Sequence, residues 1–263
     1  MKKIIIMLFS ISLLLISTSC SGINVESKSN KTTLTVSAAS SLSAVLGELG
    51  TLFEEENPDL ELRFNFGASG TLKQQIEQGA PVDLFLSAAA DKYEELVKDE
   101  YIHTGTNLVN NELVLITSKN AAWSGEYFRD LTSGQIHQLA IGTPGVVPAG
   151  TYAQQVLQSE GVWDHLQEKL ILAKDVQQVL TYVETGNVEA GIVYKTDAMQ
   201  STQVKVVAKA NPNYHEPIIY PVGVLKHSNH IKEALVFYEY LKSEEAEKLW
   251  SHYGFHLIKN DEK

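Results

Sequence analysis

The chain has 263 residues, enough for one large domain or two domains of ordinary size. Hydrophobic residues make up 44% and charged residues 20%, a composition that excludes disordered, collagen-like and many-pass membrane proteins. The formal net charge of −11 argues against a nucleic-acid-binding protein, because such proteins carry a basic face. The single cysteine excludes a disulfide framework and a four-cysteine metal site.

The N-terminal residues have the pattern of an export signal. Lys2 and Lys3 precede an apolar run over residues 4–16 that is too short to span a bilayer comfortably, and small residues then lead to Cys20. This arrangement resembles a bacterial lipoprotein signal, although Ser17 stands where leucine is commonest in that signal. We therefore expect a signal peptide over residues 1–19, a lipid on Cys20 and a flexible polar tether over residues 20–32. An uncut N-terminal anchor is the alternative.

From residue 33 onward, short apolar strands alternate with amphipathic helices. Strands are predicted at residues 34–36, 62–66, 82–86, 113–117, 139–142, 170–172, 192–194, 204–208 and 218–225. Helices are predicted at residues 42–57, around Leu72 and Ile76, and at 91–98, 151–159, 175–185, 231–241 and 246–253. This alternation predicts an α/β protein with mostly parallel sheets flanked by helices.

No Ser/Gly-rich linker divides the body, so two lobes would have to be joined by strands. The strands at 113–117 and 218–225 are the best candidates for the two crossings. They place the first lobe at residues 33–113 and 221–263, and the second lobe at residues 114–220.

Small residues stand directly before several predicted helices. The turns are 38–41 (AASS), 67–70 (GASG) and 147–150 (VPAG). A fourth turn, 174–176 (KDV), has Asp175 as the predicted cap of its helix. A helix N-terminus offers unpaired backbone N–H groups and a partial positive charge, and small residues let an anion approach them. Any one of these turns taken alone is better explained as an ordinary helix cap. Four of them facing one crevice would hold a tetrahedral oxyanion without a lysine or an arginine.

Together with residues 79–85 (GAPVDLF) and 191–194 (GIVY), these turns resemble the molybdate-binding receptors of bacterial ABC importers, in order over residues 33–259. The resemblance implies a two-lobed, type II periplasmic-binding-protein fold. It also implies capture without catalysis or a cofactor: molybdate, and tungstate with it, would be held in the interlobe cleft by neutral hydrogen bonds. The implied partners are a membrane permease and its separate ATPase, with no nucleic acid and no membrane contact beyond the lipid anchor. We expect an exported monomer, on the outer face of the cytoplasmic membrane or in the periplasm.

The same resemblance implies five binding residues. From the first lobe, Ser41 and Ser69 would donate hydroxyl and backbone N–H groups. From the second, Ala149 and Val176 would donate backbone N–H groups and Tyr194 its phenolic hydroxyl. The adjacent Ser40 remains an alternative to Ser41. Position 70 is glycine where some relatives carry serine, so a backbone donor remains there without a hydroxyl.

Three other functions stay open. A receptor selective for tungstate, or one for sulfate, fits the same turns. A metal receptor would use the pairs His227 with His230 or His252 with His256, although no carboxylate pattern completes either pair. A secreted hydrolase would need a nucleophile at the GASG turn, where the G-x-S-x-G spacing is absent.

Overall fold

Two β-sheets with flanking helices organise the protein in the computed structural model, which describes residues 31–258 except residue 124. The part from Lys31 onward is one compact unit. The predicted signal peptide, Cys20 and most of the predicted tether lie outside the described residues. Within the described part, no helix has both the length and the apolar character needed to cross a bilayer.

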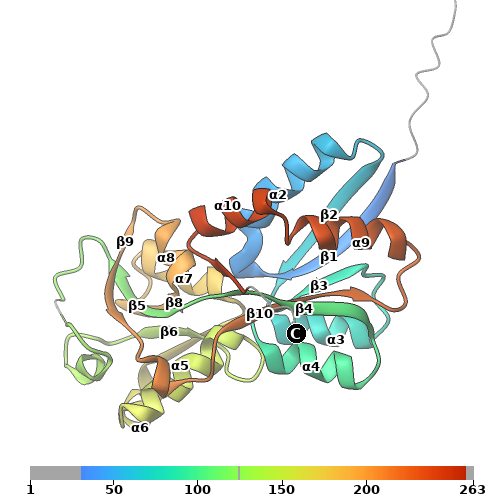
Figure 1. Cartoon of the computed structure of the whole chain (residues 1–263). Coiled ribbons are helices and arrows are strands. Elements are labelled where there is room, and N and C mark those ends of the chain that lie inside the picture. The colour runs from blue at the N-terminus through green and yellow to red at the C-terminus, as the bar shows by residue number, and fades with distance from the viewer. Residues whose placement is uncertain (1–30, 124, 259–263) are drawn as a thin grey trace, which may run out of the picture. The chain divides into compact units, whose positions relative to one another are not determined.

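The first sheet and its helices form the lobe that we call the first lobe (Figure 1). Its six strands follow the order β11 (His256–Leu257), β4 (Ile102–Asn110), β10 (Ile219–Leu225), β3 (Leu84–Leu86), β1 (Thr32–Ala39) and β2 (Leu60–Gly67). Its helices are α2 (Ser43–Glu56), α3 (Ser69–Glu77), α4 (Ala90–Lys98), α9 (Ile231–Tyr240) and α10 (Glu244–His252), with the 3₁₀ turn η1 (Ser40–Leu42) before α2.

The second sheet and its helices form the second lobe. Its five strands follow the order β7 (Leu170–Ala173), β6 (Leu139–Gly142), β8 (Ala190–Tyr194), β5 (Leu113–Ser118) and β9 (Val204–Lys209). Its helices are α5 (Pro148–Ser159), α6 (Trp163–Leu166), α7 (Val176–Glu184) and α8 (Lys195–Met199). Three 3₁₀ turns complete it: η2 (Phe128–Thr132), η3 (Gln167–Lys169) and η4 (Pro212–Tyr214).

Both sheets are mixed, which corrects the prediction of mostly parallel sheets. β1 pairs parallel with β2 and β3, and β6 pairs parallel with β7 and β8. All pairs made by β4, β5, β9 and β10 are antiparallel. These four strands carry the chain between the lobes: β4 and β9 lead into a crossing, and β5 and β10 follow one. None of them is joined to a neighbouring strand of its sheet by a helical crossover. The parallel strands are those joined by βαβ units, as the alternation predicts.

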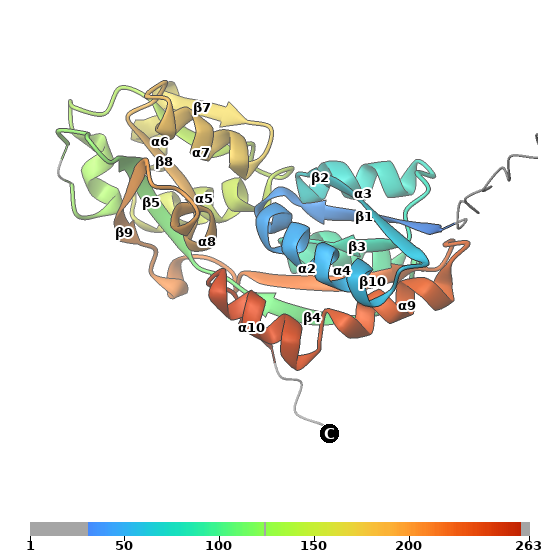
Figure 2. The same cartoon turned by 90° about the horizontal axis from the view of Figure 1, so that it is seen from above.

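The chain passes between the lobes twice, once from β4 to β5 and once from β9 to β10 (Figure 2). Leu113 pairs with Tyr194 in the second sheet, and Tyr220 pairs with Val109 in the first. The predicted lobe boundaries after residues 113 and 220 therefore lie slightly too late. The sequence does not predict β4, because Ile102 is the one apolar residue in the first six positions of the strand. None of the side chains at these six positions is fully buried, so the strand has no apolar alternation.

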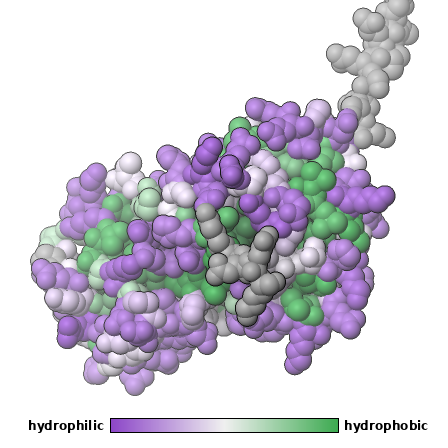
Figure 3. Space-filling model, viewed as in Figure 1, coloured by the Kyte–Doolittle hydropathy of each residue, from purple (hydrophilic) through white to green (hydrophobic). Residues whose placement is uncertain are grey.

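Apolar side chains fill the space between the sheets and their helices. The largest of the fully buried ones include Trp250, Phe53 and Phe237, which pack where α2, α9 and α10 meet the first sheet. The buried Trp250 indole N–H donates to the Leu241 carbonyl at 3.0 Å, which satisfies its polar atom. Charged and polar side chains cover most of the face seen in Figure 3.

Candidate functional site

A small cavity lies between the two lobes, at the carboxyl ends of strands from both sheets. It is lined by Ala39, Ser40, Ser41, Gly67, Ala68, Ser69, Ala88, Val147, Pro148, Ala149, Val176 and Tyr194. The structure therefore brings all five predicted binding residues, and the alternative Ser40, to one place. No charged side chain is among these described lining residues.

The first part of the wall comes from the turn after β1. β1 ends at Ala39 and η1 begins at Ser40, so both candidate serines lie in the 3₁₀ turn that precedes α2. Both are buried. The Ser41 hydroxyl is 3.0 Å from the Tyr220 hydroxyl, which couples it to the first sheet. Ser40 and Ser41 both line the cavity.

Helix α3 contributes the second part of the wall. Ala68 precedes the helix in an extended conformation and makes no side-chain cap, so no capping side chain covers the N–H of Ser69 at the start of the helix. Ser69 is completely buried, and its Oγ accepts the backbone N–H of Ala88 at 2.9 Å. Because a hydroxyl both accepts and donates, this contact leaves the Ser69 proton free for an acceptor in the cavity.

The second lobe contributes the N-termini of α5 and α7. Pro148 begins α5, and the buried Ala149 follows it in the first turn, where no intrahelical acceptor exists for its N–H. The Asp175 carboxylate accepts the N–H of Gln178 at 2.9 Å, which confirms the predicted cap of α7. This bond engages the third residue of the helix and leaves the N–H of Val176 at the cavity.

Tyr194 closes the cavity from the end of β8. Only 1% of this residue is exposed, and its hydroxyl donates to the Ala88 carbonyl of the first lobe at 3.4 Å. Burial raises the pKa of the Tyr194 hydroxyl well above its ordinary value. The group is therefore a protonated hydrogen-bond donor at neutral pH.

Three residues behind the cavity were not predicted. The Asn111 amide donates to the Tyr220 hydroxyl at 3.2 Å and to the Thr196 hydroxyl at 2.9 Å, and so joins the lobes beside the crossing. Tyr220 also packs edge-on against the Tyr194 ring. Neither contact has a local sequence signal, because the partners lie far apart in the chain.

The third of these residues, Asp197, is buried beneath Tyr194. Its carboxylate accepts the backbone N–H of Tyr194 at 3.2 Å and the Gln177 side-chain amide at 2.7 Å. It therefore links the first turns of α7 and α8. Burial raises the pKa of Asp197 to about 7. The spacing of three residues from Tyr194 is that of a helix N-cap and its acidic partner, a signal that could have identified it.

These groups make a cavity of hydrogen-bond donors. Helix N-termini from both lobes face it with their partial positive charges, a favourable setting for an anion. A serine and a histidine arranged as a nucleophile and its base do not occur among the lining residues. The described residues also contain no group of three or more His, Cys, Asp or Glu side chains that could hold a metal ion. Within them, neither of the two predicted histidine pairs belongs to such a group.

Two α/β lobes around such a cavity define a binding protein of the periplasmic type. The chain belongs to the bacterial extracellular solute-binding protein family, whose model matches residues 34–256. This is a family of binding proteins and not of enzymes.

Solved structures confirm the predicted type II fold. The periplasmic molybdate-binding protein of Azotobacter vinelandii is similar with a TM-score of 0.79 and 24% identity, over 86% of this chain and 100% of that one. The sulfate-binding protein SubI of Mycobacterium tuberculosis is similar with a TM-score of 0.75 and 16% identity, over 87% of this chain and 88% of that one.

Among the relatives by sequence, YvgL of Bacillus subtilis, provisionally named a substrate-binding lipoprotein of an ABC transporter, is 44% identical over 97% of this chain and 98% of its own length. The molybdate-binding protein ModA of Escherichia coli is 38% identical over 84% of this chain and 88% of its own. ModA of Haemophilus influenzae is 37% identical over 84% and 89%.

Proposed function

We propose that this protein captures molybdate, and tungstate with it, and delivers the oxyanion to the permease of an ABC importer. The observation that carries the proposal is the convergence of uncharged donors from both lobes on one cavity. Identities of 38% and 37% to two molybdate-binding proteins support the choice of oxyanion.

In this proposal the ligand is held from both sides. Ser41 or Ser40 and Ser69 donate from the first lobe, and the remaining donors come from Ala149, Val176 and Tyr194 of the second lobe. The Tyr194 hydroxyl has one proton, so on binding it turns from the Ala88 carbonyl to the ligand. An oxyanion that carries no proton at neutral pH can accept from every donor. Phosphate keeps a proton there, and this cavity offers few acceptors for it. Because contacts from both lobes form only when the lobes are closed, the ligand favours closure.

We further propose that the protein acts outside the cytoplasmic membrane as a monomer, with a lipid on Cys20. The export-signal pattern of residues 1–19 and the 44% identity to the YvgL lipoprotein support this location. The permease, with its separate ATPase, would receive the closed form, and no cofactor enters the process.

The test is a calorimetric titration of the part from Lys31 onward with molybdate, tungstate, sulfate and phosphate. We expect one-to-one binding of molybdate and tungstate, and weak or undetectable binding of sulfate and phosphate. Sulfate binding tighter than molybdate binding would replace the proposal with a sulfate receptor. Silence towards all four anions from a folded sample would refute an oxyanion site.

The site residues are tested by Ser69→Ala and Tyr194→Phe. Each removes one donor, so each is expected to weaken molybdate binding by about 0.5–3 kcal/mol. The same measurement on Ser40→Ala and Ser41→Ala identifies which serine donates. Ser251→Ala on the exposed side of α10 and Tyr127→Phe, whose residue is 52% exposed, are matched controls. Unchanged affinity in both Ser69→Ala and Tyr194→Phe would remove the site assignment.

A further inference from the structure

A direct backbone hydrogen bond joins the two lobes beside the cavity. The N–H of Gly70, in the first turn of α3, donates to the carbonyl of Val146 at 3.0 Å. Val146 lies in the turn that precedes α5, so the bond runs from the first lobe to the second. The backbone donor that the sequence leaves at position 70 is therefore used between the lobes and is not directed at the cavity.

The contact is possible only because residue 70 has no side chain. A Cβ atom at this position would lie 2.6 Å from the Val146 carbonyl oxygen and 3.0 Å from its Cα. Non-bonded carbon atoms reach their optimal separation at about 3.5–4.0 Å, so even a methyl group would collide with the backbone of the other lobe. The backbone at Gly70 is helical, and alanine would fit its conformation.

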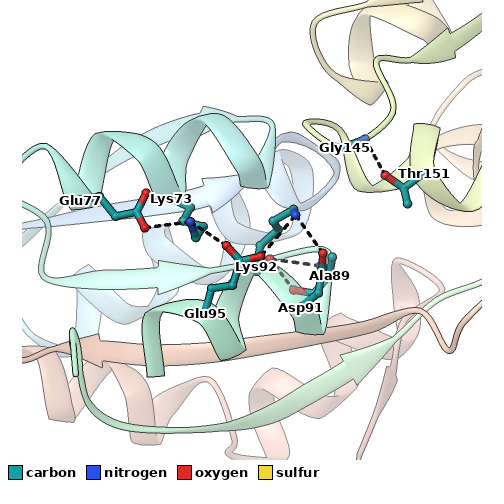
Figure 4. A network of polar contacts seen from close by, with 9 residues as sticks. Lys73, Glu77, Ala89, Asp91, Lys92, Glu95, Gly145 and Thr151 are labelled. Carbon is teal, nitrogen blue, oxygen red and sulfur yellow. Dashed lines mark hydrogen bonds and ion pairs between the residues drawn. The ribbon is translucent and has the colours of Figure 1, made fainter. Parts of the chain in front are cut away.

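Each partner is tied to its own lobe by polar contacts, some of which Figure 4 shows. Lys73 binds Glu77 of α3 at 2.8 Å and Glu95 of α4 at 2.7 Å, which ties α3 to its neighbour. On the other lobe, the Gly145 N–H donates to the Thr151 hydroxyl at 2.9 Å. The N–H groups of Val146 and Val147 also both donate to the Thr143 carbonyl, at 3.2 and 2.8 Å. A side chain at position 70 would therefore move the two lobes apart as rigid bodies.

We infer that Gly70 is a positioning residue that sets how far the two lobes close, with its bond to Val146 acting as a latch for the closed form. The latch stabilises closure without any contact to the ligand. Apparent affinity scales with the population of the binding-competent form, so the latch tightens binding. It also fixes the width of the cavity, because Ser69 is the neighbour of Gly70 and Ala149 is in the helix that follows Val146. The choice of molybdate as the probe rests on the proposed function.

The experiment compares the unaltered protein with Gly70→Ala and with the control Gly47→Ala. Gly47 is exposed in α2 and a Cβ there would meet nothing within 4 Å, so both variants replace a helical glycine by a better helix former. Calorimetry gives the affinity for molybdate, and small-angle X-ray scattering gives the radius of gyration without ligand and at saturation. We expect Gly70→Ala to lose at least tenfold in affinity and to remain more expanded at saturation, and Gly47→Ala to match the unaltered protein in both.

The latch is overturned if Gly70→Ala matches the unaltered protein in two quantities. These are the affinity for molybdate and the radius of gyration at saturation. If the unaltered protein binds no oxyanion, the proposed function fails, and the latch is still tested by scattering without ligand. In that case a larger radius of gyration for Gly70→Ala than for Gly47→Ala supports the latch, and equal radii refute it. Thermal unfolding of each variant verifies that it is folded.

Discussion

Neutral donors at single residues explain how a carrier can hold an anion and still release it. A hydroxyl such as that of Ser69 or Tyr194 contributes a hydrogen bond to a charged acceptor, and such bonds contribute about 1.5–3 kcal/mol each. Several of them together give firm binding, and each can be lost separately as the lobes open. A buried lysine would instead leave an uncompensated charge in the cavity after release, at a large desolvation cost.

The Asp197 carboxyl is an ionisable group that contacts the backbone of one of these donors, Tyr194. Burial, assisted by the negative charge of Asp175 at the start of α7, raises its pKa from an ordinary 3.8 to about 7. The hydroxyls of Tyr194 and Tyr220 also feel the Asp197 charge. In the folded protein the group therefore keeps a proton in a pH range where the unfolded chain has already released it.

We expect Asp197 to make the protein less stable as pH rises from about 4 to about 7. The folded state binds the extra proton in this range, so the free energy of unfolding falls by at most about 1.4 kcal/mol per pH unit. Asp197→Asn keeps an acceptor oxygen and removes the titration. The free energy of unfolding is measured with urea at pH 5, 6, 7 and 8. Relative to the unaltered protein, that of the variant should rise up to about pH 7 and then stay at a constant difference. Asp164→Asn on the exposed surface of α6 is the control, and an equal pH trend in all three proteins would contradict this expectation.

At the scale of elements, the cavity depends on how closely α5 approaches the end of β6. A Cβ at Gly150 would lie 1.8 Å from the Gly142 carbonyl oxygen, so only glycine allows the first turn of the helix to rest against the strand. This approach places the N–H of Ala149 at the cavity.

Gly150→Ala is therefore expected to destabilise the fold by about 1–3 kcal/mol, the usual cost of overpacking, and to weaken molybdate binding as well. Denaturant unfolding and calorimetry measure the two effects. Gly47→Ala again provides the control, because the same replacement in an open position of a helix should not destabilise. A Gly150→Ala protein as stable as the control would mean that the helix can shift without loss.

How much of the elements could be predicted depends on how local their causes are. The starts of α3, α5 and α7 follow from small or capping residues next to apolar strands, and these were predicted together with the binding turns. Strand β4 and the antiparallel pairing of the crossing strands depend on partners far along the chain, such as Tyr220 for Val109. The network around Asn111 and the bond from Gly70 to Val146 are tertiary for the same reason.

At the scale of the whole molecule, an acidic protein surrounds a neutral cavity. The net charge of −11 opposes an approaching anion only at short range, because salt screens charges beyond roughly 8–10 Å. Within the cavity, the oriented donors outweigh that field. An acidic surface is therefore compatible with anion binding. The cavity also does not depend on the segment that would attach the protein to the membrane.

Anchoring and capture are therefore expected to be independent properties. The body is a compact unit from Lys31 onward, and the cavity is built entirely from residues 39–194. Expression in a Gram-positive host should place the unaltered chain in the membrane fraction, whereas Cys20→Ser, which cannot accept the lipid, should appear in the soluble or secreted fraction. Both forms, once purified, should bind molybdate with the affinity of the part from Lys31 onward. A Cys20→Ser protein that stays in the membrane fraction would favour an uncut N-terminal anchor, and an affinity that changed with the anchor would show that residues before Lys31 take part in capture.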